Sequence, residues 1–390
     1  MKTLVNIITD DNPIPAYLFI KEKYEKGDRI MYISAKDTED DLEWLSVIDG
    51  VSSDFIDEVV LKNDIDEFKY EKICRAVKTH LQNGVHYCVN LAGGTRYMAL
   101  AVQQVFRNFD SEFFYVNIED NTIVKSTYDD SIYDDDDFFY PIKYRMSMQE
   151  YLTAHNLVHD LEKAGHTPMY PFEMSENMFQ MFTQGLFSDR DFQIMEMLRE
   201  SYRNRKNGAL LADIERPTRP NLKAIPDIRR FLADICVTCH NGRLSRPQIE
   251  WITGGWFEEY IYYRVQKDIA PDDCRTGVHI SRKGVKRDNE LDVVFIKNNR
   301  FFVIECKTGV ETERKFNEIV YKACALREAL LGVACHSYIA SLKHDTNDDL
   351  KKIAANMDIT FWDYAAMTAG LTTELKEIQK FHQNKDSRRE

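Results

Sequence analysis

The chain has 390 residues, of which 44% are hydrophobic and 12% aromatic, and its formal net charge is −13. This length excludes a single small module and allows two or three domains, each with its own core. No run of residues approaches the apolar length of a membrane span, and the acidic balance confines nucleic-acid binding to local basic segments. Acidic residues follow the start of the chain too soon for a secretory signal, so we expect a cytoplasmic protein with no membrane partner.

Strand and helix signals alternate over the first 145 residues. Strands are expected at 4–9, 29–34, 58–61, 86–90, 113–117 and 122–127. Helices are expected at 15–25, 39–46 and 68–82. This alternation predicts a parallel sheet covered by helices. Ligands bind such sheets beyond the carboxyl ends of the strands, which here means the segments after Thr9, Ser34 and Asn90.

Two of these segments have the composition of a binding site. After Asn90, Gly93 and Gly94 let a ligand approach the backbone, and Thr95 stands where a helix begins and where free N–H groups attract phosphate. After the first strand, the residues at 9–13 supply polar side chains for bases or ribose hydroxyls. A purely structural turn is the alternative, and the absence of G-x-G-x-x-G argues against a dinucleotide cofactor.

Residues 146–244 look mostly helical, and an Arg/Pro-rich loop at 215–220 interrupts them. We expect a connector or a small winged-helix-like insert. Cys236 and Cys239, followed by His240, match half of a zinc site, but no second Cys pair is near. Apolar residues around them recur at helical spacing, which favours a buried helix face.

Beyond residue 245 the pattern returns to mixed strands and helices. Helices are expected at 245–253, from 256 onward, at 313–331, at 348–357 and at the C-terminus, with strands at 335–340 and 360–362. Between the second and third of these helices, two apolar runs at 291–296 and 301–304 flank a turn-like segment. This predicts a β-hairpin in which Ile296 pairs with Phe301.

That register brings four charged side chains together. It sets Asp292 opposite Glu305 and Glu290 opposite Lys307, which shares a face with Glu305. Carboxylates about 5 Å apart repel each other, but together they can hold a hard divalent cation. The alternative is a surface hairpin in which Glu290 pairs with Lys307 and the acidic pair is solvated.

The stretch from about 245 to 370, with Asp292 followed by Glu305-x-Lys307, resembles the PD-(D/E)xK nuclease superfamily. Leu291 stands where the family name has proline, which leaves the metal ligand in place. The resemblance implies that Asp292 and Glu305 hold Mg²⁺ or Mn²⁺. It implies that Lys307 orients the attacking water or stabilises the phosphorane charge.

The family often adds a glutamate from the preceding helix. Glu258, in Gly255-Trp-Phe-Glu258, is the preferred candidate, and Glu259 and Glu290 stay open as alternatives. The substrate implied is nucleic acid, with single-stranded DNA or RNA expected. A basic segment before the hairpin supplies candidate phosphate contacts: Arg282, Lys283, Lys286 and Arg287.

The first 145 residues resemble the CRISPR-associated Rossmann fold (CARF) domain, whose mark is the loop that reads Gly93-Gly94-Thr95-Arg96 here. The resemblance implies a homodimer that binds a cyclic oligoadenylate, with cyclic tetra-adenylate expected. The implied ligand contacts are Thr9, Asp11, Asn12, Gly93, Gly94, Thr95 and Arg96, with Ser34 and Lys36 as further candidates.

We therefore predict an α/β protein with a Rossmann-like CARF domain at 1–145, a helical connector at 146–244 and a restriction-endonuclease-like domain at 245–390. Such a fusion implies a nuclease of type III CRISPR antiviral defence that the cyclic nucleotide activates allosterically. One rival is a ligand-responsive transcription regulator, against which the intact acidic set argues. The other is a repair or restriction-type endonuclease without second-messenger control.

Overall fold

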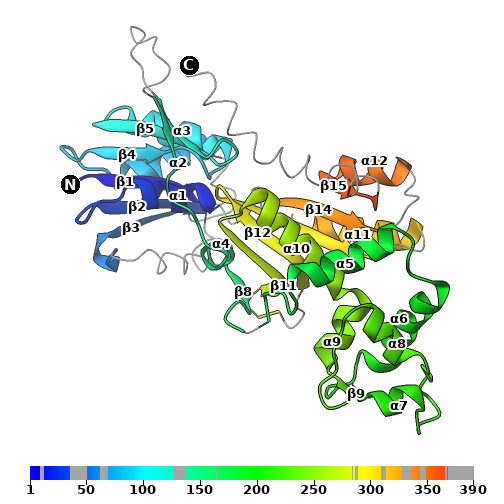
Figure 1. Ribbon diagram of the computed structural model, residues 1–390. Helices are drawn as coiled ribbons and strands as arrows, with labels where there is room; N and C mark the ends of the chain where they lie inside the picture. The colour runs from blue at the N-terminus through cyan, green and yellow to red at the C-terminus, as the bar shows by residue number, and fades with distance from the viewer. Residues whose placement is uncertain are drawn as a thin grey trace, which may run out of the picture.

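The structure is a computed structural model. The residues that it describes are 1–8, 13–35, 51–61, 69–126, 138–163, 165–282, 284–285, 289–308, 313–326, 335–342, 348–364 and 367. Two lobes are visible, each built around a β-sheet, with a group of helices beside the C-terminal sheet (Figure 1). Among the described helices, none has the length and apolar composition needed to cross a bilayer.

The N-terminal sheet has seven strands in the order β3-β2-β1-β4-β5-β6-β7. Their bounds are β1 Thr3–Ile8, β2 Arg29–Ala35, β3 Ile56–Leu61, β4 Tyr87–Asn90, β5 Ser111–Asn117, β6 Thr122–Ser126 and β7 Phe139–Pro141. The strands from β3 to β5 in this order are parallel, as predicted. β6 and β7 are antiparallel additions, so the sheet is mixed rather than wholly parallel. A short hairpin connection between β5 and β6 allows only the antiparallel arrangement.

Helices cover both faces of this sheet. Their bounds are α1 Ile14–Lys23, α2 Tyr70–Lys78 and α3 Arg96–Phe106, and a 3₁₀ turn spans Ser53–Phe55. Tyr17 and Phe19 of α1 are buried in one core, while Ile73 of α2 and Met98 of α3 are buried in the core on the other face. The helix predicted at 39–46 lies outside the described residues.

The C-terminal sheet has six strands in the order β15-β14-β13-β12-β11-β8. Their bounds are β8 Leu157–His159, β11 Asp273–Arg282, β12 Asn289–Lys297, β13 Arg300–Lys307, β14 Cys335–Ser341 and β15 Ile359–Trp362. The helices around it are α10 Trp256–Ile269, α11 Glu313–Leu326 and α12 Asp348–Asn356. β8 reaches this sheet from the region before residue 245 and pairs with β11.

β11 was not predicted. Its buried positions alternate along the strand, but Cys274 and Thr276 occupy two of them, so the alternation carries little hydrophobic contrast in the sequence. β11 pairs with β12 along its length, and β12 is therefore an inner strand of the sheet.

The predicted hairpin register is confirmed. Ile296 pairs with Phe301, and the two-residue turn Asn298-Asn299 has φ of 50° and 63°, as a type I′ turn requires. The ladder between β12 and β13 runs to Val293 and Ile304, one step short of Asp292 and Glu305.

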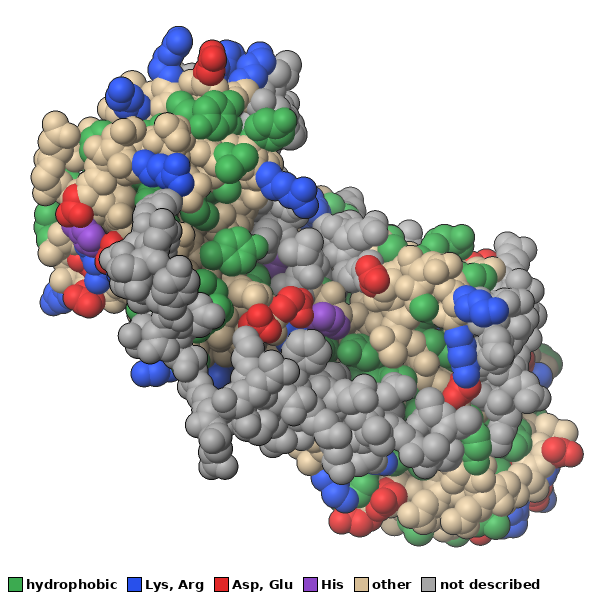
Figure 2. Space-filling view, turned by 90° about the horizontal axis from the view of Figure 1, so that it is seen from above, with side chains coloured by type: hydrophobic (Ala, Val, Ile, Leu, Met, Phe, Trp, Pro, Cys, Tyr) green, Lys and Arg blue, Asp and Glu red, His purple; other side chains and the backbone are tan. Residues whose placement is uncertain are grey.

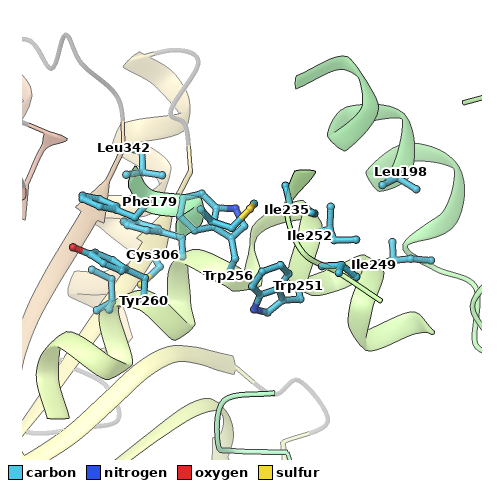
Figure 3. Packing of buried hydrophobic residues seen from close by; sticks show 14 of the residues in the cluster. Phe179, Leu198, Ile235, Ile249, Trp251, Ile252, Trp256, Tyr260, Cys306 and Leu342 are labelled. Atoms are coloured by element: carbon cyan, nitrogen blue, oxygen red, sulfur yellow. The ribbon is translucent and has the colours of Figure 1, made fainter. Parts of the chain in front are cut away.

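The middle region forms a helical module with a small two-stranded sheet. Its elements are α5 Phe172–Thr183, α6 Asp189–Tyr202, β9 Ala209–Leu210, α7 Leu211–Glu215, α8 Ile228–Asp234, β10 Arg243–Leu244 and α9 Arg246–Glu250. The preceding helix, α4 Met148–Ala154, is separate from this module and packs in the core that holds α1. A π-helical turn, Trp251–Gly255, joins α9 to α10. The apolar core continues from Leu198 and Ile249 through Trp256 to Cys306 and Leu342 (Figure 3). The module and the C-terminal sheet therefore share one core.

The cysteine pair of this module does not form the expected buried helix face. α8 ends at Asp234, and Cys236 follows in a left-handed conformation, with φ of 59°, and is exposed. Cys239 is half-buried and packs against the module's core. The prediction is wrong for Cys236 because the helix stops one turn earlier than the apolar spacing suggested.

The two lobes meet at the turn of the hairpin. Asn299 is fully buried, accepts a hydrogen bond from the backbone N–H of Met146 (2.9 Å) and donates to Asn121 Oδ1 in the β5–β6 turn (2.8 Å). Arg300 contacts Glu119 in the same turn, with 3.4 Å between Nη1 and Oε2. The hairpin that carries Asp292 and Glu305 is thus fixed directly to the N-terminal sheet.

Candidate active site and sensing edge

Asp292, Glu305 and Lys307 converge at the open end of the β12–β13 hairpin. Lys307 Nζ lies 2.7 Å from Glu305 Oε1 and 3.3 Å from Asp292 Oδ2. Both carboxylates are largely buried. The backbone N–H of Cys306 lies just beyond the end of the β12–β13 ladder and donates a hydrogen bond to Asp292 Oδ2 (2.7 Å). β13 also pairs with β14, where Glu305 is the partner of Ile339, and this pairing holds the backbone of Glu305 in place.

A further carboxylate reaches the cluster from the first turn of α10. Glu258 is half-buried, and burial, followed by the negative charges of Asp292 and Glu290, raises its pKa to about 8. Burial and the charge of Glu305 raise the pKa of Asp292 to about 6. Burial would lower the pKa of Lys307, but the charges of Asp292 and Glu305 outweigh it and raise that pKa.

The two alternative glutamates have other surroundings. Glu259 is buried on the opposite side of α10, where it accepts hydrogen bonds from Trp251 Nε1 (2.7 Å) and from the backbone N–H of Met169. Glu290 is exposed, and its Cα partner across β11 is His279. Glu258 is therefore the α10 glutamate that faces the cluster, and Glu290 lies near enough to raise its pKa.

The donor set fits a hard divalent cation. Burial and the repulsion between neighbouring carboxylates raise the pKa values of Glu258 and Asp292, so these groups resist ionisation unless a positive charge comes close. Mg²⁺ and Mn²⁺ favour carboxylate oxygens, and a cation between them would relieve their mutual repulsion. The residues present therefore match the metal that the sequence implied.

One charged neighbour was missed in the sequence. Lys322 extends from α11, and its Nζ lies 3.8 Å from Glu305 Oε1. No motif marks it, because it is a single lysine on an amphipathic helix and only the packing of α11 brings it to the hairpin. In the basic segment, Arg282 is exposed at the end of β11, whereas Lys283, Lys286 and Arg287 lie outside the described residues.

The candidate ligand site, which we call the sensing edge, comprises the loops that follow β1 and β4. It lies where the strand order of the N-terminal sheet reverses. The chain proceeds from β1 outward to β3 and returns on the other side of β1 as β4, so the loops after β1 and β4 flank a switch point. Gly93 has φ of 102°, and a Cβ on Gly94 would lie 2.2 Å from Ile7 Cγ2. Thr95 caps α3 by accepting from the N–H of Met98 (3.2 Å). Gly93 is thus required by its left-handed backbone, and Gly94 by the close approach of the Ile7 side chain.

Polar residues lie at the carboxyl ends of β2 and β4 and at the start of α3. Asn90 donates to Asn6 Oδ1 (3.1 Å) and accepts from the N–H of Ala92 (3.1 Å), which fixes the start of the Gly-Gly-Thr loop. Arg96 is exposed at the start of α3. Ser34 is fully buried at the carboxyl end of β2, and within the described part of the chain its hydroxyl has no hydrogen-bond partner. Thr9, Asp11, Asn12 and Lys36 lie outside the described residues.

The fold matches solved structures along almost its full length. Protein VC1899 from Vibrio cholerae superposes with a TM-score of 0.70 at 16% identity, covering 97% of this chain and 98% of that one. Can2 from Sulfobacillus thermosulfidooxidans, solved in complex with cyclic tetra-adenylate, gives 0.70 at 19% identity, covering 97% and 99%. A type III CRISPR defence DNA nuclease activated by cyclic oligoadenylate gives 0.50 at 15% identity, covering 87% and 45%. At these identities the likeness establishes the fold.

Family models identify both lobes. Residues 3–151 match the Card1 CARF domain, and residues 246–366 match the Card1-like endonuclease domain. The comparison with curated proteins gives no match. The two family matches together cover more than half of the chain and include both the Gly-Gly-Thr loop and the acidic cluster. The chain therefore carries a CARF domain of the Card1 type followed by a Card1-like endonuclease domain.

Proposed function

We propose that the protein cleaves nucleic acid with the help of Mg²⁺ or Mn²⁺ and that a cyclic oligoadenylate, bound by a dimer of CARF domains, activates the cleavage. The observation that carries the proposal is the convergence of Asp292, Glu305 and Lys307 with Glu258 from α10. The same chain carries a glycine loop at the switch point of a separate sheet. The presence of the acidic cluster and the glycine loop in one chain supports a ligand-controlled nuclease of type III CRISPR antiviral defence.

In the proposed mechanism Asp292 and Glu305 hold the cation, with Glu258 as an additional carboxylate. A bound divalent ion supplies Lewis-acid polarisation of the phosphodiester and lowers the pKa of water. Lys307 stays protonated because its pKa is raised, so it acts as a hydrogen-bond donor and positive charge rather than as a base. Its contacts with both carboxylates support a role in stabilising the negative charge that develops on the scissile phosphate.

The proposed substrate is single-stranded DNA or RNA. Arg282 lies at the exposed end of β11, the neighbour of the catalytic β12 in the sheet. Together with Lys283, Lys286 and Arg287, which lie outside the described residues, it forms the proposed set of phosphate contacts. The net charge of −13 confines such binding to this kind of local segment.

The proposed activator is cyclic tetra-adenylate, the ligand in the solved Can2 complex. Gly93, Gly94, Thr95 and Arg96 would contact its phosphates at the start of α3, and the buried hydroxyl of Ser34 offers a further polar group. The segments that hold Thr9, Asp11, Asn12 and Lys36 complete the proposed contact set.

The proposed homodimer would form over α3. Tyr97 and Leu100, directly after the glycine loop, are 54% and 58% exposed, which is high for large apolar side chains on one helix. Figure 2 shows exposed hydrophobic side chains with Lys and Arg around them on the left-hand lobe, which is the N-terminal domain. A second copy covering this surface would bring two glycine loops together around one cyclic ligand.

A cleavage assay on the full chain tests the proposal. Labelled single- and double-stranded DNA and RNA would be incubated with Mn²⁺ or Mg²⁺ and with cyclic tri-, tetra- or hexa-adenylate in turn. We expect cleavage of single strands that requires both the metal and cyclic tetra-adenylate. Lys307→Ala should lower the rate by about 10²–10³-fold, because it removes a positive charge that acts on the transition state.

Glu305→Ala should abolish cleavage while ligand binding persists. The matched control is Glu200→Ala, an exposed glutamate on α6 that pairs with Lys223, and it should keep wild-type activity. Equal cleavage without any cyclic nucleotide would instead identify a repair or restriction-type enzyme. Ligand binding with no cleavage of any substrate would favour the regulator.

A further inference from the structure

A second group of metal-binding side chains lies in the CARF domain, apart from both sites described above. His86 directly precedes β4, Cys88 lies within β4, and Glu112 lies within β5. One ligand atom from each of them falls within 4.8 Å of the others. Neither the acidic cluster nor the glycine loop includes any of these residues.

The sheet itself brings the three together. β4 and β5 are parallel neighbours, and Cys88 is the direct partner of Glu112. His86 precedes Cys88 by two residues and therefore shares its face of the sheet. The group stands at the amino end of β4, whereas the glycine loop follows the carboxyl end, so the two lie at opposite edges.

Two of the three ligands are oriented by a neighbour outside the group. Asp110 Oδ2 lies 3.1 Å from His86 Nδ1, and this contact leaves Nε2 facing Cys88 Sγ and Glu112 Oε2, each at 3.8 Å. Lys125 Nζ binds the other oxygen of Glu112, Oε1, at 2.5 Å. A carboxylate behind a metal-binding histidine is a usual feature of zinc sites, because it fixes the tautomer and raises the basicity of the ring.

The spacing suits a small ion. Zinc bound about 2.3 Å from sulfur and about 2.0 Å from nitrogen or oxygen separates tetrahedral donors by about 3.3–3.5 Å. The distances of 3.8 Å from His86 Nε2 to Cys88 and to Glu112 are only slightly longer, so small side-chain movements would close them around an ion. Thiol, imidazole and carboxylate together select zinc over magnesium or calcium.

Cys88 is the most buried of the three side chains and is only 5% exposed. Zinc binds cysteine as the thiolate, so a bound cation would displace the thiol proton. Among the charged groups that act on the sulfur, Glu112 and Asp28 oppose Lys2 and Lys23, so the surroundings are not strongly cationic.

We propose that His86, Cys88 and Glu112 bind Zn²⁺, with water in the fourth position. The ion would tie β4 to β5 at their amino ends. β4 leads into the glycine loop, and β5 leads into the turn that contacts the catalytic hairpin through Asn121. The site would therefore stiffen the framework between the sensing edge and the nuclease.

Cobalt provides a direct test, because a thiolate bound to Co²⁺ gives a near-ultraviolet charge-transfer band that carboxylates do not give. The full chain would carry Asp292→Ala to weaken the nuclease site, would be stripped of metal and then titrated with Co²⁺. We expect the band to saturate at one equivalent per chain and to disappear when Zn²⁺ is added. Cys88→Ser should lack the band, whereas Cys74→Ser, a half-buried cysteine of the same domain, should retain it.

A second variant separates metal binding from folding. Asp110→Asn keeps all three ligands but removes the charge behind His86, so it should weaken Co²⁺ affinity by about 10–100-fold while the band persists. Zn²⁺ should also raise the Tm of the parent chain and leave the Tm of Cys88→Ser unchanged. Absence of the band in the parent chain, the same band in Cys88→Ser, or unchanged affinity in Asp110→Asn would overturn the proposal.

Discussion

At the scale of single residues, the nuclease centre depends on charges that oppose one another. Lys307 touches both Asp292 and Glu305, yet Asp292 and Glu258 still have raised pKa values. Burial is the main cause of both shifts, and the negative charges of neighbouring carboxylates add to it. Lys322, 3.8 Å from Glu305, adds a second positive charge at the edge of the cluster.

Gly94 makes a prediction about the sensing edge at the same scale. Gly94→Ala would place a Cβ 2.2 Å from Ile7 Cγ2, so either the loop or β1 must move. We expect a loss of stability of about 1–3 kcal/mol and a loss of cyclic tetra-adenylate binding, measured by calorimetry. Gly84→Ala is the control: its φ of 82° imposes strain but no atom lies within 4 Å of the added Cβ. If Gly94→Ala binds the ligand as the parent does, the loop is not the ligand site.

At the scale of secondary-structure elements, the catalytic hairpin is attached to the sensing sheet through its turn. Arg300 Nη1 lies 3.4 Å from Glu119 Oε2, and His336 Nε2 lies 3.6 Å from Glu119 Oε1. The contact with His336 and the charge of Arg300 lower the pKa of Glu119 against the effect of burial, so the carboxylate is ionised at neutral pH. Movement of the β5–β6 turn would therefore displace the strands that carry the active site.

Glu119→Gln tests this connection. It keeps the shape of the side chain but removes the charge that pairs with Arg300 and His336. We expect ligand binding to persist while activation of cleavage falls by about 5–150-fold, the range of typical allosteric coupling. Glu71→Gln on α2 is the control, because it is exposed and lies away from this turn. Full activation in Glu119→Gln would show that the signal travels by another route.

Glu150 on α4 predicts a pH dependence of stability. Burial would raise its pKa, but hydrogen bonds from Ser147, Tyr144 and Tyr17 outweigh it and lower that pKa. A carboxyl whose pKa is lower in the folded state stabilises the fold above its unfolded pKa of about 4.3 and loses this contribution as pH falls through the folded value.

Glu150→Gln should therefore destabilise the protein at pH 7, and the difference in free energy of unfolding should shrink once the pH falls below about 4. Denaturant unfolding of both proteins at several pH values measures this. A constant difference across the pH range would mean that packing, and not the carboxylate charge, stabilises α4.

At the scale of the whole molecule, activity should depend on assembly. Leu100→Asp puts a charge on the exposed face of α3, so we expect a monomer in sedimentation velocity and a loss of activation by cyclic tetra-adenylate. Leu186→Asp is the matched control, since Leu186 is 60% exposed but lies after α5 in the helical module. A monomeric parent protein, or a Leu100→Asp variant that is dimeric and active, would contradict this arrangement.

The sequence by itself determined the features that depend on neighbouring residues. Turn chemistry at Asn298 and Asn299 and the apolar runs beside them fixed the hairpin register, because side chains alternate along a strand and a one-residue slip would expose its core face. The strand that ends at Asn90 and the helix start at Thr95 were readable for the same reason.

Only the tertiary structure decided which distant side chains meet. The sequence places Glu258 and Glu259 side by side, and it is the packing of α10 that turns one toward Asp292 and the other toward Trp251. β11 was not predicted because Cys274 and Thr276 weaken the alternation of apolar and polar residues along it. The hydrogen bond between the buried Asn299 and Asn121 joins segments that are far apart in the sequence. Such contacts depend on how whole elements pack against one another, which the spacing of neighbouring residues in the sequence does not specify.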